Sequence, residues 1–369
     1  MISVDALKRA PAWVPSLLRS TLLRRQEACA GETHIYFCVA DHFEPGWHGA
    51  DLDRQRERVR IWAERYPQIA ARHCDSEGHP PQHTFFFPAE EYHPELLDAL
   101  AVLCRGGWGD VEIHLHHDRD TPEGFREKLL RFADVLHHRH GLLRKDNSGR
   151  IRYGFIHGNW VLNNSGPDGR WCGVDDETSI LLETGCYADF TMPCAPHPAQ
   201  SRKVNSIYYT LPQRAPGAHN RGVDAHVGRP APPGLLMVQG PLSLDWSCRK
   251  WGIFPRIESA DISSYNPPDR RRVLLWLRSA VHVAGAPQHV FIKLHTHGAQ
   301  EPNSQLLLRG GLQAMWRDLE HLCPQGGQYR LHYLTAYQMF LKIKALENDA
   351  AFVAGIYPKS ALRGLQTTP

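Results

Sequence analysis

The sequence predicts an α/β protein folded as a (β/α)7–8 barrel, either regular or distorted. Short apolar runs alternate with helix-like stretches along most of the chain, which is typical of parallel βαβ units. A closed barrel buries both faces of so many parallel strands. The alternative is a doubly wound open sheet, but no Gly-rich phosphate loop follows the first apolar run.

The individual elements follow from this alternation. The apolar runs predict strands at 34–40, 83–87, 111–116, 152–157, 187–192, 235–239, 290–295 and 329–334. The stretches between them predict helices at 51–73, 94–104, 122–140, 175–184, 268–283, 304–322 and 336–348.

The chain reads as one domain. A β/α barrel is expected over 33–350, preceded by an N-terminal helical extension over 1–32 and followed by a C-terminal tail over 351–369. The segment 195–233 breaks the alternation and is rich in Pro, Gly, Arg, Asn and His. Loops of this length are functional or disordered, so we expect an excursion over the barrel mouth, with disorder as the alternative.

Composition narrows the class of protein. Hydrophobic residues make up 42% and charged residues 22% of the 369 residues, which is typical of a globular protein with a sizeable core. The net charge of +3 and the lack of a basic stripe with interleaved aromatics argue against a nucleic-acid partner. The nine cysteines are scattered without a CxxC pair, which suits a reducing compartment.

The cellular location is expected to be the cytoplasm. The N-terminus has no continuous apolar stretch of the kind that signal peptides carry, and no run is long enough to span a bilayer. Residues 13–25 are apolar on one side and basic on the other. This segment predicts either a helix packed against the barrel or a peripheral contact with an anionic membrane.

Polar residues that can act in catalysis or bind a metal follow several of the expected strands. In a β/α barrel the catalytic groups lie where strands end and the next loops begin. Loops normally begin with Gly, Pro, Asn or Ser, whereas four of these strand ends carry histidine. The candidate residues at the strand ends are Asp41, His42, His114, His116, His117, Asp120, His157, Asn159, Trp160, Asp189, His295 and His297.

The end of the third strand predicts a metal site. His114 and His116 point to the same face because side chains alternate along a strand. Asp120 lies four residues after His116, within reach of a shared ion. We therefore expect a divalent ion, with His42 or Asp41 as the third ligand. The alternative is that the histidines are hydrogen-bonded core residues and that Asp120 caps the next helix.

A hydrolytic site also needs a base and an acid. A carboxylate beside a divalent ion stays ionised, so Asp41 is the candidate base. His295 ends the apolar run 290–294 and is the candidate acid, with His297 on the same face. Trp47 and Trp160 could stack on a sugar ring or could be packing residues.

At these residues the sequence resembles the polysaccharide deacetylases, the NodB-homology carbohydrate esterases, over roughly 33–298. Asp41-His42 stands where the family has an Asp-Asp pair, and Leu294-His295 matches its closing Leu-His. Glu112-Ile113 leads to His116 and Asp120, where the family has two histidines. The resemblance implies Asp41 as base, His295 as general acid, and His42, His116 and Asp120 as ligands of a zinc-like ion.

The sequence also departs from the family pattern. The family's Arg that orients the base is missing from 154–160, and its Trp-bearing motif is replaced by 188–193. The resemblance still implies a barrel of the glycoside hydrolase/deacetylase type that removes an acetyl group from a sugar or polysaccharide precursor. The further candidates for ligation or substrate contact are His114, His117, His157, Asn159, Trp160, Asp189 and His297.

Two other functions remain open from the sequence. A glycoside hydrolase needs two carboxylates facing one glycosidic bond, and Glu44 or Glu112 with Asp189 could supply them. A non-catalytic glycan-binding barrel would agree with the missing Arg and the altered ligands. Metal content separates these alternatives, because only the deacetylase hypothesis requires a bound divalent ion.

Overall fold

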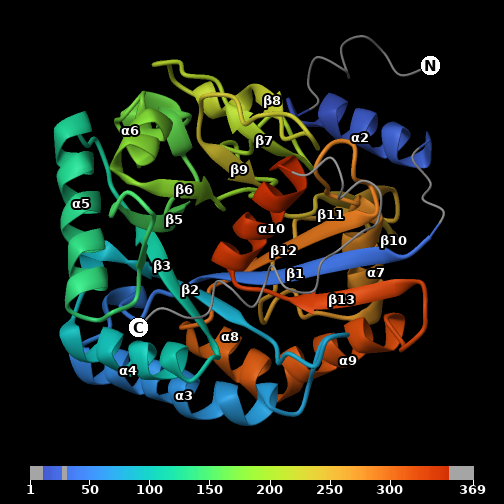
Figure 1. Cartoon of the computed structure of the whole chain (residues 1–369), viewed down its shortest axis with the longest axis horizontal. Coiled ribbons are helices and arrows are strands. Elements are labelled where there is room, and N and C mark those ends of the chain that lie inside the picture. The colour runs from blue at the N-terminus through green and yellow to red at the C-terminus, as the bar shows by residue number, and fades with distance from the viewer. Residues whose placement is uncertain (1–10, 27–30, 349–369) are drawn as a thin grey trace.

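The computed structural model describes residues 11–26 and 31–348 and shows a mixed α/β fold around one large, mostly parallel sheet (Figure 1). The strands are β1 (Thr33–His42), β2 (His83–Pro88), β3 (Gly109–Leu115), β4 (Arg144–Lys145), β5 (Ile151–His157), β6 (Cys186–Asp189), β7 (Ile207–Thr210), β8 (Gly222–Asp224), β9 (Leu236–Val238), β10 (Ser243–Lys250), β11 (Phe254–Glu258), β12 (His289–Thr296) and β13 (Tyr329–Tyr333).

The helices are α2 (Val14–Gln26), α3 (Leu52–Ala70), α4 (Pro94–Arg105), α5 (Pro122–His138), α6 (Glu177–Thr184), α7 (Arg270–Ser279), α8 (Glu301–Leu306), α9 (Leu312–Leu322) and α10 (Ala336–Asn348). A π-helical turn (Leu307–Gly311) joins α8 to α9, so the helix expected at 304–322 is interrupted there. Short 3-10 turns lie at Trp47–Gly49, Ala89–Glu91, Leu162–Asn164, Pro167–Gly169 and Ala218–Asn220. Each expected strand and helix has a counterpart, with ends shifted by a few residues.

The sheet does not show the closed barrel that the sequence predicts. Its strand order is β12-β1-β2-β3-β5-β6-β9-β7-β8, with β13 paired to the first half of β1. Strands β7 and β8 pair antiparallel, and no pairing joins β9 to β12 in the described part of the chain. The sheet therefore has an opening between β12 and the β6–β9 side.

A buried lysine spans this opening. Lys293 in β12 is wholly buried, and its ammonium donates hydrogen bonds of 2.7 Å each to Phe190 O and Met192 O, just after β6. Gly240 N donates to Met192 O in turn, and a Cβ on Gly240 would collide with the backbone oxygen of Lys293. Side-chain hydrogen bonds therefore take the place of a backbone ladder here.

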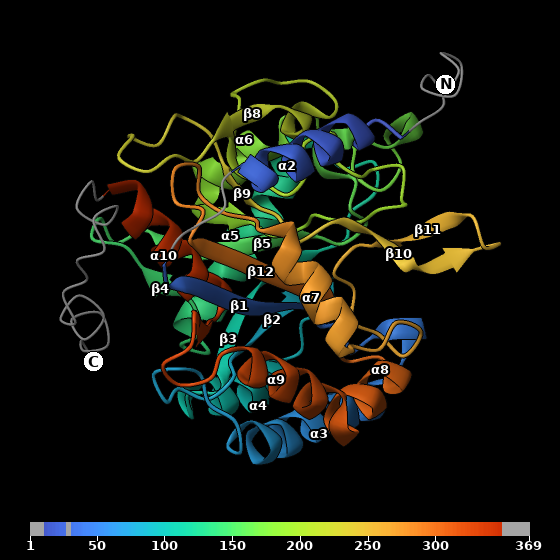
Figure 2. The same ribbon diagram turned by 90° about the vertical axis from the view of Figure 1, so that its right-hand side faces the viewer.

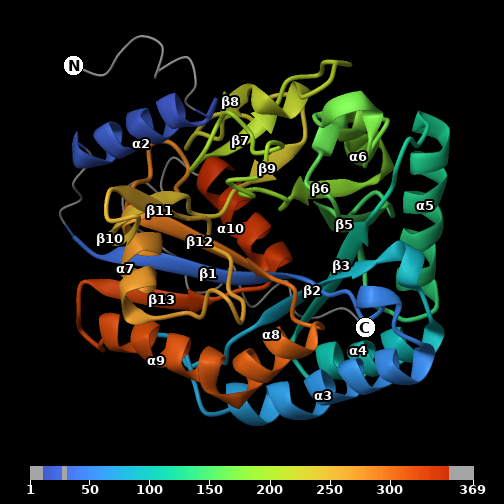
Figure 3. The same ribbon diagram turned by 180° about the vertical axis from the view of Figure 1, so that it is seen from behind.

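The two faces of the sheet have different coverings. Ile35, Phe37 and Val39 of β1 point into a large core with α3, α4, α5, α7 and α9. Tyr36 and Cys38 point the other way and pack against α10. Figure 3, seen from behind, shows α7 on the side of β1 and β12 away from α10. We call these the outer face and the inner face.

The N-terminal helix packs onto the segment that interrupts the alternation. Trp13 and Leu17 are buried in a small core with Ala195, Val204 and Leu242. The segment 13–25 therefore packs as a helix against the rest of the protein, which is one of the two expected alternatives. Leu18 and Leu22 are exposed, and contact with a membrane stays a prediction. Within 195–233 the chain forms β7 and β8 rather than a plain loop. No helix in 11–26 or 31–348 combines the length and apolar character needed to cross a bilayer.

The two-stranded hairpin of β10 and β11 projects from the body of the molecule (Figure 2). Its large apolar side chains Trp246, Trp251, Ile253 and Phe254 are exposed, Trp251 by 77%. The hairpin therefore adds little to the main core.

Candidate metal centre at the ends of β1 and β3

His42, the last residue of β1, lies on the inner face and is wholly buried. Neither of its ring nitrogens has a hydrogen-bond partner within residues 11–26 and 31–348. Its ring centroid lies 4.9 Å from that of His114 and 4.7 Å from that of His297. Burial, and then the neighbouring histidines, hold the pKa of His42 well below its usual value. The ring is therefore neutral, with a lone pair for a ligand.

His114, on the inner face of β3, has a proton arrangement that favours a cation. Its Nδ1 lies 3.0 Å from Ile156 O, and a carbonyl can only accept, so the ring proton is on Nδ1. A neutral ring then turns the Nε2 lone pair toward Glu44 Oε1, 3.3 Å away. Burial lowers the pKa of His114, which disfavours a second proton. A metal ion between the lone pair and the carboxylate resolves this mismatch.

Glu44 supplies the negative charge of the centre. It lies two residues after His42, and its Oε2 accepts a 2.8 Å hydrogen bond from His297 Nδ1. Burial would raise its pKa, but His297 and His116 hold the pKa well below the ordinary glutamate value. Glu44 is therefore an ionised carboxylate in a buried setting.

His42, Glu44 and His114 fit a divalent ion. Their ligand atoms all lie within 4.8 Å of one another, and all three residues are buried. Two neutral imidazoles and one carboxylate form a common catalytic zinc set, which leaves a coordination position for water. Two further buried atoms nearby, His295 Nδ1 and Trp160 Nε1, have no hydrogen-bond partner in the part of the chain that the structure describes. These atoms could contact a bound ligand.

Two histidines beside the centre, His116 and His297, contact carboxylates. His116 lies between carboxylates, with Nδ1 2.5 Å from Glu90 and Nε2 3.2 Å from Glu44. Burial lowers its pKa, but the two carboxylates outweigh this and raise it to about 10. Burial also lowers the pKa of His297, but Glu44 outweighs this effect and the pKa is raised. The carboxylates therefore favour the protonated form of both rings.

The structure does not bring the expected ligand set His42, His116 and Asp120 together. Asp120 lies 3.3 Å from His117 Nδ1 and 2.7 Å from Lys128 Nζ instead. The reason is the path of the loop after β3, where Asp120 N donates to Cys172 O and the chain leaves the inner face. The alternative role of Asp120 as the cap of the next helix is also wrong, because the side chain of Thr121 caps α5.

Asp41 points to the outer face, away from His42, because successive side chains of a strand alternate. Its Oδ2 accepts a 2.9 Å hydrogen bond from His83, and its Oδ1 accepts one of 2.6 Å from Gly298 N. Both oxygens are thus engaged in the outer core, and the role of Asp41 as base stays a prediction. His295 lies on the inner face, with its ring centroid 6.1 Å from that of His42, so the structure places it at the centre. Its role as acid also stays a prediction.

The remaining candidates, Trp160, Asn159 and Asp189, have different surroundings. Trp160 lies beside His42 and His297, with ring centroids 6.5 Å and 6.3 Å away. Asn159 N donates to His157 Nδ1. Asp189 is buried and bonded to Thr191, and burial raises its pKa to about 7.

The carboxylates of the glycosidase hypothesis are not equivalent. Glu112 is buried and bonded to Arg144, Tyr187 and Gly154 N, so its hydrogen-bonding capacity is used inside the fold. Glu44, the other candidate, lies in the metal centre. The pairing of either with Asp189 stays a prediction.

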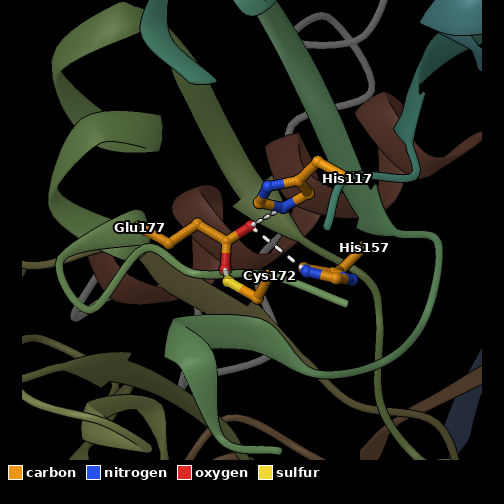
Figure 4. Close-up of side chains that lie close together, drawn as sticks. All are labelled: His117, His157, Cys172 and Glu177. Atoms are coloured by element: carbon orange, nitrogen blue, oxygen red, sulfur yellow. Dashed lines mark hydrogen bonds and ion pairs between the residues drawn. The ribbon is translucent and has the colours of Figure 1, made fainter. Parts of the chain in front are cut away.

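A second cluster lies on the outer face of β3 and β5 (Figure 4). His117 follows β3, His157 ends β5, Cys172 lies in the loop after β5, and Glu177 begins α6. All four are buried, and their ligand atoms lie within 4.8 Å of one another. The sequence named the two histidines but not Cys172, which lies in a loop without periodicity, or Glu177, which does not follow a strand end. Glu44 had a usable signal, since it follows His42 by two residues.

Comparisons with known proteins add little to this picture. No protein-family model matches the chain, and no curated protein matches it. A solved structure of an alpha-mannosidase from Enterococcus faecalis is 10% identical, with a TM-score of 0.42. The match covers 89% of this chain and 30% of that one, so the chain spans about a third of the mannosidase.

Proposed function

We propose that this protein is a metal-dependent hydrolase acting on a carbohydrate, with the ion held by His42, Glu44 and His114. The observation that carries the proposal is the pair of buried imidazoles without proper partners. His42 has no hydrogen bond at either ring nitrogen, and His114 directs a lone pair at a carboxylate. Unsatisfied buried groups of this kind are costly unless a ligand pairs with them.

The ion, when bound, would polarise an acyl carbonyl and activate water for attack. The residues of the chain supply the other functions. Carboxylates raise the pKa of His297 and His116, which are the candidate proton donors to a departing amine or alcohol. Trp160 offers an aromatic face beside the centre for stacking on a sugar ring. Removal of an acetyl group is the finer proposal, and it rests on the motif resemblance at Asp41-His42 and Leu294-His295.

Elemental analysis of purified variants tests the ligand set. We expect His42→Ala and His114→Ala each to lose one equivalent of zinc relative to the wild type. His321→Ala, which removes an exposed histidine on α9, is the matched control and keeps the wild-type content. Asp120→Ala should keep this equivalent too, since Asp120 contacts Lys128 and His117 instead. Wild-type metal content in His42→Ala and His114→Ala would contradict the proposal.

Activity is measured as release of acetate from N- and O-acetylated oligosaccharides. We expect release by the wild type and its loss in His42→Ala, with His321→Ala unaffected. Release of new reducing ends without acetate would contradict the acetyl proposal and favour a glycosidase.

A further inference from the structure

The cluster of His117, His157, Cys172 and Glu177 is separate from the proposed catalytic centre. It lies on the outer face of the sheet, where His117 stacks on Phe125 of α5 at a centroid distance of 4.8 Å. Residues from β5, from the loop after it and from the start of α6 converge there (Figure 4). We propose that these four residues bind a second zinc ion, which is structural and closed to substrate.

The spacing of the ligand atoms fits a tetrahedral ion. His117 Nε2 and His157 Nε2 lie 3.2 Å and 3.6 Å from Glu177 Oε1, and Cys172 Sγ lies 3.4 Å from Glu177 Oε2. Zinc bonds of about 2.0–2.3 Å in tetrahedral geometry separate neighbouring ligand atoms by roughly 3.3–3.8 Å. These three distances lie close to that range, and one ligand atom from each of the four residues lies within 4.8 Å of the others.

The charges of the set also balance. When the ion binds, Cys172 and His117 would each give up a proton, and the Cys172 thiolate and Glu177 carboxylate would then neutralise a divalent cation held with two neutral imidazoles. A neutral complex can be buried at low cost, whereas an unpaired charge cannot. All four side chains are buried, and four protein ligands complete the coordination of a structural zinc.

The surroundings supply the outer contacts that such a site needs. Asp120 Oδ2 lies 3.3 Å from His117 Nδ1, which places a carboxylate behind a ligating histidine. His157 Nε2 is buried, has no hydrogen-bond partner among the described residues, and lies 3.6 Å from Glu177 Oε1. Ligation there requires the His157 Nδ1 to carry the proton. The contact with Asn159 N, now 3.1 Å, must therefore open when the ion binds.

The consequence is a fixed loop. Residues 158–176 contain only short 3-10 turns, and this loop carries Trp160 next to His42. An ion that ties Cys172 and Glu177 to the ends of β3 and β5 holds that loop in place. The second site thus acts on the catalytic centre by positioning, and it does not require the proposed hydrolysis to be correct.

Cobalt substitution distinguishes the two sites. We expect the Co²⁺-substituted wild type to show a thiolate-to-cobalt charge-transfer band in the near ultraviolet. Cys172→Ser should lose this band and one equivalent of metal, whereas Cys74→Ser, which removes an exposed thiol, should lose neither. His42→Ala should keep the band while losing the other equivalent. The experiment therefore distinguishes a wrong proposal for the catalytic site from a wrong proposal for this second site.

X-ray absorption at the zinc edge covers the case in which Cys172→Ser does not fold. The wild-type protein should show a sulfur scatterer at about 2.3 Å from zinc. In ¹⁵N-labelled protein the Asn159 amide resonance should shift when a chelator removes zinc. A zinc spectrum without sulfur, or cobalt protein without the charge-transfer band, would overturn the proposal.

Discussion

Adjacent residues at the ends of β1 and β3 serve opposite faces of the sheet. Asp41 bonds to His83 and Gly298 on the outer face, while His42 lies in the candidate centre on the inner face. His116 likewise contacts Glu44, and His117 belongs to the outer cluster. The alternation of a strand therefore decides which chemistry each residue can join.

Gly298 is required at its position by close packing. A Cβ there would collide with the carboxylate of Asp41 and the ring of Trp62, both wholly buried. We expect Gly298→Ala to lower the free energy of unfolding by about 1–3 kcal/mol, because overpacking of a tight core forces shifts of this cost. Urea denaturation measures the change.

Gly124→Ala is the control for this prediction. Its Cβ would come closest to Asp120 Oδ1 and Thr121 Oγ1, at the start of α5. Neither of these residues is fully buried, so the change should be smaller than that in Gly298→Ala. Equal destabilisation by both substitutions would show that the contact with Asp41 is not the cause.

The sequence predicted single elements well and their assembly less well. Apolar periodicity located β1, β3, β12 and most helices, because burial of one face sets that pattern. The opening beside β12 could not be predicted, since it depends on the Lys293 side chain rather than on backbone pairing.

The expected ligand set His42, His116 and Asp120 differs from the clusters that the folded chain forms. The spacing of His116 and Asp120 assumed a tight turn, whereas the loop carries Asp120 to His117. Cys172 comes from an irregular segment and Glu177 from the start of α6, so only the folded chain shows that they are neighbours.

At the scale of elements, Lys293 makes stability depend on pH. Burial lowers its pKa to about 8 in the folded protein, below the ordinary lysine value. Between these two values the unfolded chain binds more protons, so stability from this group increases as pH rises. From pH about 8 to about 10, the wild type should gain up to about 3 kcal/mol relative to Lys293→Met.

Urea denaturation over this pH range measures the difference. Lys145→Met, at an exposed position of β4, serves as the control, and its curve should run parallel to that of the wild type. A Lys293→Met curve that also runs parallel to the wild type would show that the buried ammonium is not the source of the dependence.

At the scale of the whole molecule, Trp13 and α2 pack against the segment that contains β7 and β8. Trp13 is 5% exposed and packs with Val204 and Leu242. We expect Trp13→Ala to lower stability by about 3 kcal/mol and to speed cleavage within 195–242 in limited proteolysis.

Trp251→Ala provides the matched control on the hairpin. Trp251 is 77% exposed, so its removal should change stability by no more than about 0.5 kcal/mol and leave the cleavage pattern unaltered. Unchanged cleavage in Trp13→Ala would mean that α2 does not protect the segment.

The opposed faces of β1, β3 and β5 also restrict how the gene can vary in length. One codon added or lost inside Gly109–Leu115 would turn every later side chain of β3 to the other side. His114 would then enter the helix-covered core, and both groups of polar residues would be broken by one event. We therefore expect insertions and deletions to be tolerated in the connection between β8 and β9. In β1, β3 and β5 we expect them to abolish the sites.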